Sequence, residues 1–87
     1  MANKLISYRR YMLEKITTQD GCWIQYQLNL RHITQASIAD KACCSRGIVS
    51  HFLNARKNSP TVRVALAEAL GYKDFEQLLI DARMSAA

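Results

Sequence analysis

Two helix starts lie close together near the middle of the chain, at Thr34 and Ser45. Threonine and serine are preferred N-cap residues, because their hydroxyl group accepts a hydrogen bond from a free backbone N–H of the first turn. Apolar residues flank each start at the N′ and N4 positions of a hydrophobic staple: Ile33 with Ile38, and Cys44 with Val49. The first helix should therefore run from Gln35 to about Lys41, and the second from residue 46 to about 53. Two short helices separated by three or four residues form a helix-turn-helix pattern.

The rest of the chain also favours helices. No segment shows the clean period-two alternation of apolar and polar residues that is typical of a strand. Further helices are predicted at about 4–17 after Asn3, at about 22–31 after a break at 17–21, at 60–70 before Gly71, and from 75 onward after Asp74. The side chains expected in the core are Ile24, Leu28, Ile38, Val49, Phe52, Leu53, Val62, Leu66, Ala69, Leu70, Phe75, Leu78, Leu79 and Ala82. The pattern predicts an all-α fold of five to six helices.

Length and composition exclude several classes of protein. A chain of 87 residues is long enough for one domain. A hydrophobic content of 49% argues against a disordered chain. Charged residues make up 22%, and no stretch approaches the roughly 20 apolar residues of a membrane-spanning helix, so we expect no membrane partner.

Positive charge is concentrated in the first part of the chain. Residues 1–63 hold ten Lys or Arg residues and three Asp or Glu residues, a net charge of +7, whereas residues 64–87 carry a net charge of −2. A basic front and an acidic end suggest that the front faces a polyanion. Many small domains are basic, so charge alone does not identify that partner.

The three cysteines, Cys22, Cys43 and Cys44, are expected to be reduced. Two of them are neighbours in sequence, and adjacent cysteines rarely satisfy the geometry of a disulfide bond. The alternative is a zinc site, but His32 and His51 do not supply the paired spacings that zinc sites show. We therefore expect no metal ion and a cytoplasmic protein.

One segment resembles a known family. The stretch TQASIADKACCSRGIVSHFLNARK followed by SPTVRVALAEALGY is similar to the helix-turn-helix domain of phage lambda-repressor and Cro-like regulators. The resemblance covers roughly residues 22–80 and implies a lambda-repressor-like DNA-binding domain over residues 21–84. Residues 1–20 would then be an additional N-terminal helical extension.

The resemblance implies that the second helix of the pair lies in the major groove of DNA, with its N-terminal residues at base edges. Residues implied to contact bases are Arg46, Gly47, Ile48, Ser50 and His51. Residues implied to contact backbone phosphates are Gln35, Ser45, Asn54, Arg56 and Lys57. Arg46 suits a bidentate pair with guanine, and Ile48, expected to be exposed because Val49 points inward, suits a thymine methyl group. The alternatives are that Arg46 is an ordinary surface charge and that Ile48 belongs to a protein interface.

Two residues depart from the family pattern. Cys43 occupies the turn position where the family usually has a glycine with positive φ, a conformation that is unfavourable for a residue with a Cβ atom. We therefore expect a turn that is relaxed or one residue longer. Gly47 lowers the helix propensity of the second helix by about 1 kcal/mol relative to alanine. It would either permit close approach to DNA or leave a helix that becomes ordered only on binding.

The resemblance implies a sequence-specific regulator that binds double-stranded DNA, which we expect to be a dimeric repressor of phage or mobile-element type. The homodimer interface is expected in the N-terminal helix or in the final helix, where the apolar candidates are Phe75, Leu79 and Met84. The alternative is an antitoxin or other interaction module that binds a partner protein through residues 1–20 and represses its own operon. No glycine-rich phosphate loop, carboxylate pair or nucleophile–base set stands out, so we expect neither an enzyme nor a cofactor.

Overall fold

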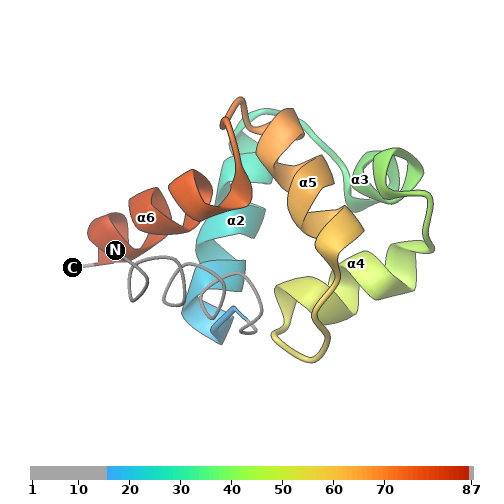
Figure 1. Cartoon of the computed structure of the whole chain (residues 1–87), viewed down its shortest axis with the longest axis horizontal. Helices are drawn as coiled ribbons and strands as arrows, with labels where there is room; N and C mark the ends of the chain where they lie inside the picture. Colours follow the sequence, from blue (N-terminus) through green and yellow to red (C-terminus); the bar gives the residue numbers. More distant parts are fainter. Residues whose placement is uncertain (1–15, 87) are drawn as a thin grey trace, which may run out of the picture.

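A computed structural model of the chain describes residues 16–86, which form five α-helices and no β-strand (Figure 1). The helices are α2 (Thr18–Leu30), α3 (Gln35–Ala42), α4 (Arg46–Leu53), α5 (Pro60–Ala69) and α6 (Phe75–Ala86). The predicted all-α fold is confirmed for this part of the chain. The helix predicted at about 4–17 lies outside the described residues except for its last two positions, and there Thr17 is extended and caps α2.

Helix α2 begins four residues earlier than predicted. The Thr17 hydroxyl oxygen accepts a hydrogen bond from the backbone N–H of Asp20 at 3.1 Å, and the Asp20 carboxylate accepts one from the N–H of Thr17 at 3.0 Å. This reciprocal pair is a capping box, which satisfies two backbone donors and starts the helix. The break predicted at 17–21 is therefore wrong, and the boundary placed between residues 20 and 21 falls inside α2.

Gly21 lies within α2 because the helix passes very close to the end of α4. A Cβ atom at this position would lie 2.8 Å from the carbonyl carbon of Leu53 and would overlap the carbonyl oxygen. The absence of a side chain thus permits backbone contact between the two helices. The sequence predicts that Gly21 lies in a break between helices, whereas its role is this close approach.

The other helix starts agree with the predictions. The hydroxyl oxygens of Thr34, Ser45 and Ser59 each accept a hydrogen bond from the backbone N–H three residues later, at 3.1, 3.3 and 3.4 Å. Asp74 accepts one from the N–H of Gln77 at 2.9 Å. Gly71, which follows α5, has the left-handed conformation expected of a residue just beyond a helix end, with φ of 79°.

A single apolar core holds the five helices together. α3 packs against α4 and α5, α2 packs against α4 and α6, and α5 packs against α6. In Figure 1, α5 runs through the middle of the molecule, with α3 and α4 on one side and α6 on the other. The apolar side chains predicted to face the core are buried, except for Ala69, which is half-buried.

Polar contacts fix α6 in place. Asp20, which is only 4% exposed, pairs with the Arg83 guanidinium at 3.3 Å and so connects α2 to the last turn of α6. The Tyr72 hydroxyl donates to the Asp81 carboxylate at 2.7 Å. The pKa of the Tyr72 phenol is raised above its usual value. The main cause is partial burial, and the hydrogen bond to Asp81 adds to it. The phenol therefore keeps its proton at alkaline pH, and it continues to donate its hydrogen bond to Asp81 there.

We predict that Gly21→Ala and Gly47→Ala change stability in opposite directions. The first substitution forces a methyl group into the Leu53 backbone and should lower the free energy of unfolding by about 1–3 kcal/mol or more. The second meets only the Ser45 hydroxyl at 3.8 Å, so it should raise stability by up to about 1 kcal/mol through helix propensity. Urea unfolding followed by circular dichroism measures both. Equal stability of Gly21→Ala and the wild-type chain would contradict the close approach.

Candidate nucleic-acid interface

The turn between α3 and α4 consists of three residues, Cys43, Cys44 and Ser45. Cys43 has φ of 56° and ψ of 45°, which is the left-handed conformation. The N–H of Cys44 donates to the carbonyl of Ala39 at 3.0 Å and closes the end of α3. The expectation of a relaxed or longer turn is therefore wrong, because Cys43 adopts the strained conformation itself, at a cost of about 1–2 kcal/mol.

Helix α4 presents one face to the core and the other to solvent. Val49, Phe52 and Leu53 are buried, whereas Arg46, Gly47 and His51 are exposed and Ser50 is half-buried. Ile48 was expected to be exposed, and this is wrong: its side chain is half-buried and packs against the core. Ile48 lies four residues before the buried Phe52, and residues four apart share one face of a helix, so Ile48 borders the side of α4 that faces the core.

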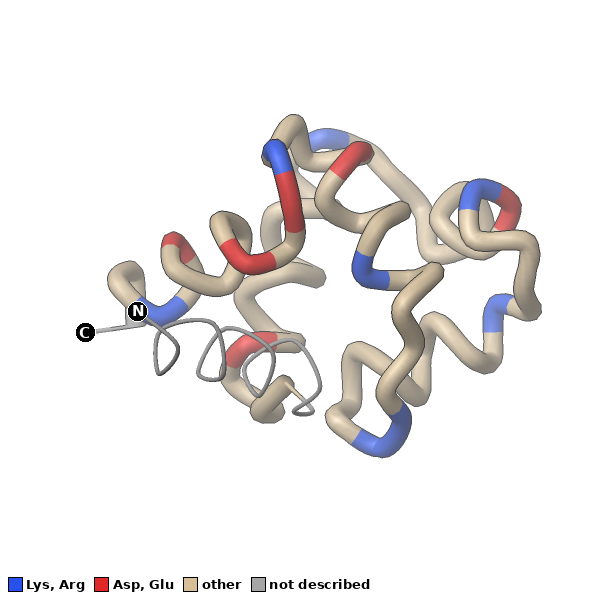
Figure 2. The backbone as a smooth tube through the Cα atoms, in the orientation of Figure 1, with Lys and Arg blue, Asp and Glu red and all other residues tan. Residues whose placement is uncertain are grey.

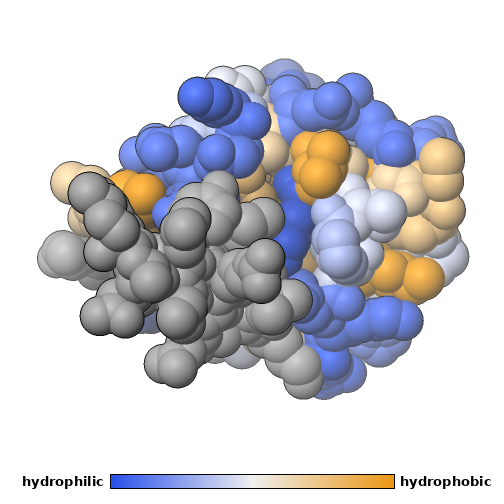
Figure 3. All heavy atoms as spheres, viewed as in Figure 1, coloured by the Kyte–Doolittle hydropathy of each residue, from blue (hydrophilic) through white to orange (hydrophobic). Residues whose placement is uncertain are grey.

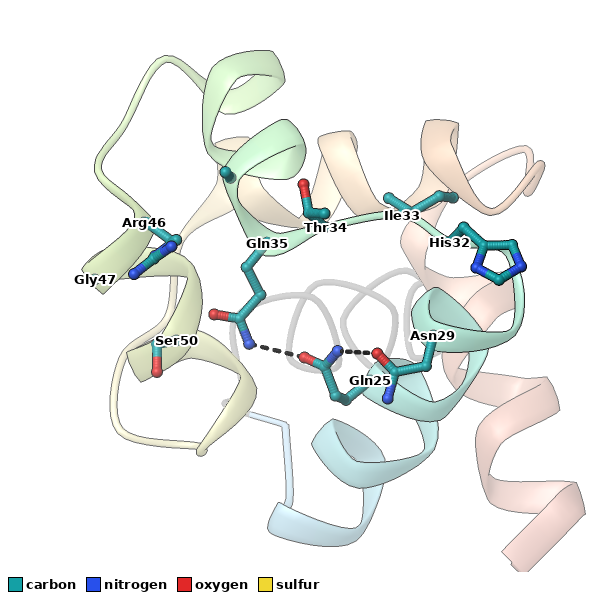
Figure 4. A pocket seen from close by; sticks show the side chains of 10 residues that line it. Gln25, Asn29, His32, Ile33, Thr34, Gln35, Arg46, Gly47 and Ser50 are labelled. Carbon is teal, nitrogen blue, oxygen red and sulfur yellow. Dashed lines mark hydrogen bonds between the residues drawn. The ribbon is translucent and has the colours of Figure 1, made fainter.

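A polar groove lies where the start of α4 faces the second half of α2 (Figure 4). Its wall on α4 is formed by Arg46, Gly47 and Ser50. The rest of the lining comes from the second half of α2, the segment that follows it and the start of α3: Gln25, Asn29, His32, Ile33, Thr34, Gln35 and Ala36. The N-termini of both short helices therefore border the same groove. Backbone N–H groups in the first turn of a helix have no acceptor within the helix, so such ends favour anions.

Three amide side chains are connected across this groove. The Gln35 amide nitrogen donates to the Gln25 oxygen at 2.7 Å, and the Gln25 nitrogen donates to the Asn29 oxygen at 2.9 Å (Figure 4). The contacts fix Gln35 against α2. Each amide nitrogen carries two hydrogens, so Gln35 retains one N–H for a further acceptor.

The loop that follows α4 carries the remaining predicted phosphate contacts. Arg56 and Lys57 are exposed, and Figure 2 shows basic positions in this loop and at the start of α4. The Asn54 side-chain nitrogen donates to the Ser50 carbonyl at 2.9 Å, so this amide caps the helix end. The hydroxyl oxygen of Ser45 likewise caps the N–H of Ile48.

The structure brings some of the predicted site residues together and separates others. Gln35, Arg46, Gly47 and Ser50 share the groove, whereas His51, Asn54, Arg56 and Lys57 lie beyond its lining, toward the end of α4 and in the loop. Acidic positions are concentrated elsewhere, on α6 and the segments next to it (Figure 2). An exception is Asp40, which lies on α3 beside Lys41.

Sequence reasoning missed the part of the groove that α2 supplies. Gln25 and Asn29 of α2, and His32 just after it, line the groove, yet the sequence predicts α2 only as a packing helix. A signal was present, because Gln25 and Asn29 are four residues apart and therefore lie on one face of the helix. That spacing indicates a polar face but not which element lies opposite.

We predict that Cys43→Gly stabilises the chain and that Cys44→Gly destabilises it. Glycine adopts the left-handed conformation without strain, so the first change should raise the free energy of unfolding by about 1 kcal/mol. Cys44 is half-buried against the core, and its loss should cost about 1–2 kcal/mol. Denaturant unfolding of the reduced proteins measures both. A destabilised Cys43→Gly variant would show that the turn is not strained.

Comparison with known proteins gives no assignment to a family. The chain matches no protein-family model, no curated protein and no solved structure. No helix in the described part of the chain has the length and apolar character needed to cross a membrane. Among residues 16–86, no group of three or more His, Cys, Asp or Glu side chains is placed to hold a metal ion. The candidate interface therefore rests on its own geometry and charge.

Proposed function

We propose that this chain is a sequence-specific regulator that binds double-stranded DNA through α3 and α4, with the lambda-repressor-like helix-turn-helix arrangement that the sequence resembles. The observation that carries the proposal is the groove into which the N-termini of both short helices open beside Arg46. A turn of three residues holds the two helices against each other, and α4 has a solvent face free of acidic residues.

Phosphate contacts would orient the protein on the duplex. The first turns of α3 and α4 offer backbone N–H groups and positive dipole ends, and Gln35 offers a side-chain N–H. Arg56 and Lys57 extend this surface beyond the end of α4. Such contacts fix register and strengthen binding to every sequence alike.

Base contacts would come from the exposed face of α4. Arg46 is its first residue, so its guanidinium can reach guanine O6 and N7 while the helix lies in the major groove. Gly47 leaves open space beside it, which permits close approach of the backbone to DNA. Ser50 and His51 continue the same face. Ile48 is withdrawn from this set because its side chain packs inward.

A dimer would supply the specificity that one such helix lacks. The eight residues of α4 span about 12 Å, which limits the number of base pairs in reach. Two copies on a near-palindromic operator would double the contacts and block polymerase by occupancy. Of the interface residues suggested by the sequence, Phe75 and Leu79 are buried in the core and Met84 is 73% exposed. The other large apolar side chains exposed in the described region are Tyr26, Leu30, Val64 and Ile80.

A second candidate function is a module that binds a protein partner and represses its own operon. Val64 is 61% exposed on α5 and lines an apolar groove on each side, toward α3 and toward α6. Figure 3 shows apolar side chains over α5 as a small patch among hydrophilic ones. Copurification of a second protein that is lost in Val64→Glu, with DNA binding retained, would favour this function.

Arg46→Ala should relax specificity at one base position. Loss of a bidentate contact costs about 1–3 kcal/mol of binding to the preferred site and little on random DNA. Sites selected from random duplexes by the wild-type chain and by the variant supply the measurement, with light scattering to size the complex. Lys73→Ala is the matched control, because Lys73 is also an exposed basic residue but lies between α5 and α6. An unchanged preference in Arg46→Ala would remove Arg46 from the base contacts.

Lys57→Ala should instead weaken binding to all sequences alike. A residue that neutralises one phosphate releases about one counterion, so its removal should lower the slope of log affinity against log salt by about 1. Fluorescence anisotropy with selected and random duplexes at several salt concentrations measures this slope. An effect on the selected duplex only would mean that Lys57 contacts a base. Equal binding of both duplexes by the wild-type chain at about 150 mM salt would contradict specific regulation.

A further inference from the structure

Arg63 is a buried cation in the middle of the fold. Arg63 is only 4% exposed. Its guanidinium carbon lies 5.0 Å from the centre of the Phe75 ring and 6.0 Å from the centre of the Phe52 ring. The two rings belong to α6 and α4, so the guanidinium lies among three helices. Burying a charged group is costly, and an apolar side chain of similar volume often serves packing equally well. Packing alone therefore does not account for an arginine here.

One polar contact of Arg63 reaches the loop behind α4. Its Nε donates to the Asn58 side-chain oxygen at 2.8 Å. Asn58 directly follows Arg56 and Lys57. The guanidinium thus holds the end of the segment that carries both exposed basic residues.

The two ends of this loop are held from different helices. At its start, the N–H groups of Ala55 and Arg56 donate to carbonyls of the last turns of α4, at 3.0 and 2.9 Å. At its end, Asn58 is held from α5 through Arg63. The Arg63–Asn58 hydrogen bond is partly buried and has a charged donor, and such charge-assisted bonds are among the stronger ones in proteins. The loop is therefore fixed at both ends relative to the exposed face of α4.

We infer that Arg63 is a positioning residue, which sets the 54–59 loop so that Arg56 and Lys57 lie in register with the bases that α4 contacts. The alignment of Arg56 and Lys57 with the bases rests on the proposed DNA-binding function. The fixing of the loop does not, because it follows from the Arg63–Asn58 contact.

The chemistry requires an arginine at this position. A guanidinium is flat, stacks on aromatic rings and keeps its N–H groups in fixed directions, so the rings of Phe52 and Phe75 orient Nε toward Asn58. A lysine ammonium has the same charge but no planar group to orient and no donor at the Nε position. Arg63→Lys should therefore behave like a loss of the contact, although the charge is kept.

The first test needs no DNA. Trypsin cleaves after Arg56 and Lys57 only when the loop opens, and cleavage after Lys41 within α3 reports on wider unfolding. Asn58→Ala should raise the ratio of loop cleavage to Lys41 cleavage by about tenfold, which corresponds to the loss of one charge-assisted hydrogen bond. Asn58→Asp, which keeps the acceptor oxygen, should stay near the wild-type ratio for cleavage after Arg56, a bond that residue 58 does not adjoin. An unchanged ratio in Asn58→Ala, or equal ratios in the Ala and Asp variants, would overturn the inference.

The second test asks whether the contact acts through the loop charges. Asn58→Ala is combined with Arg56→Ala/Lys57→Ala, and the affinity for a random 20-base-pair duplex is measured. In the wild-type background, Asn58→Ala should weaken binding to the duplex about three- to tenfold. In the variant that lacks both charges it should leave the affinity unchanged. An equal loss in both backgrounds would overturn the positioning role. Failure of the wild-type chain to bind any duplex would overturn the proposed function, whereas the cleavage ratio would still decide whether Arg63 holds the loop.

Discussion

The backbone contact between α2 and the last turn of α4 is the constraint on which the candidate interface depends. Gly21 permits it, because any side chain there would collide with the carbonyl of Leu53. The contact brings α2 beside α4, so that Gln25 and Asn29 form the wall opposite Arg46. A larger separation of these helices would open the groove and release the amide chain that holds Gln35. The surface that we propose for DNA is therefore shaped by a contact at the opposite end of α4.

Two of the three non-glycine residues with positive φ in the described region flank α4, and one of its two buried charged residues lies against this helix. Cys43 holds a left-handed conformation before α4, and Ala55 holds one after it, with φ of 62°. Arg63 places a buried charge beneath α4 and ties down the loop that leaves it. Each of these features costs stability and none is required to fill the core. Their common effect is to fix where α4 begins, where it ends and where the following basic residues lie.

Local features of the chain were predictable and long-range ones were not. The starts of α3, α4 and α5 follow from Thr34, Ser45 and Ser59, because a cap acts within one turn of its own helix. The core positions follow from helical periodicity, because residues three and four apart lie on the same face of a helix. Gly21 acts through a contact with Leu53, which is distant in sequence. Arg63 acts through Phe75 and Asn58, and helical periodicity identifies neither partner.

Titration of the isotope-labelled chain with a selected duplex, followed through the chemical shift of each backbone amide, would show directly whether α3 and α4 contact DNA. We expect the largest changes at the starts of α3 and α4, along the exposed face of α4 and in the 54–59 loop, while α6 changes little. Such a map would combine the groove and the loop charges into one surface. Changes centred on α5 and α6 instead, or no change at a saturating concentration of duplex, would contradict the assignment of α4 to DNA.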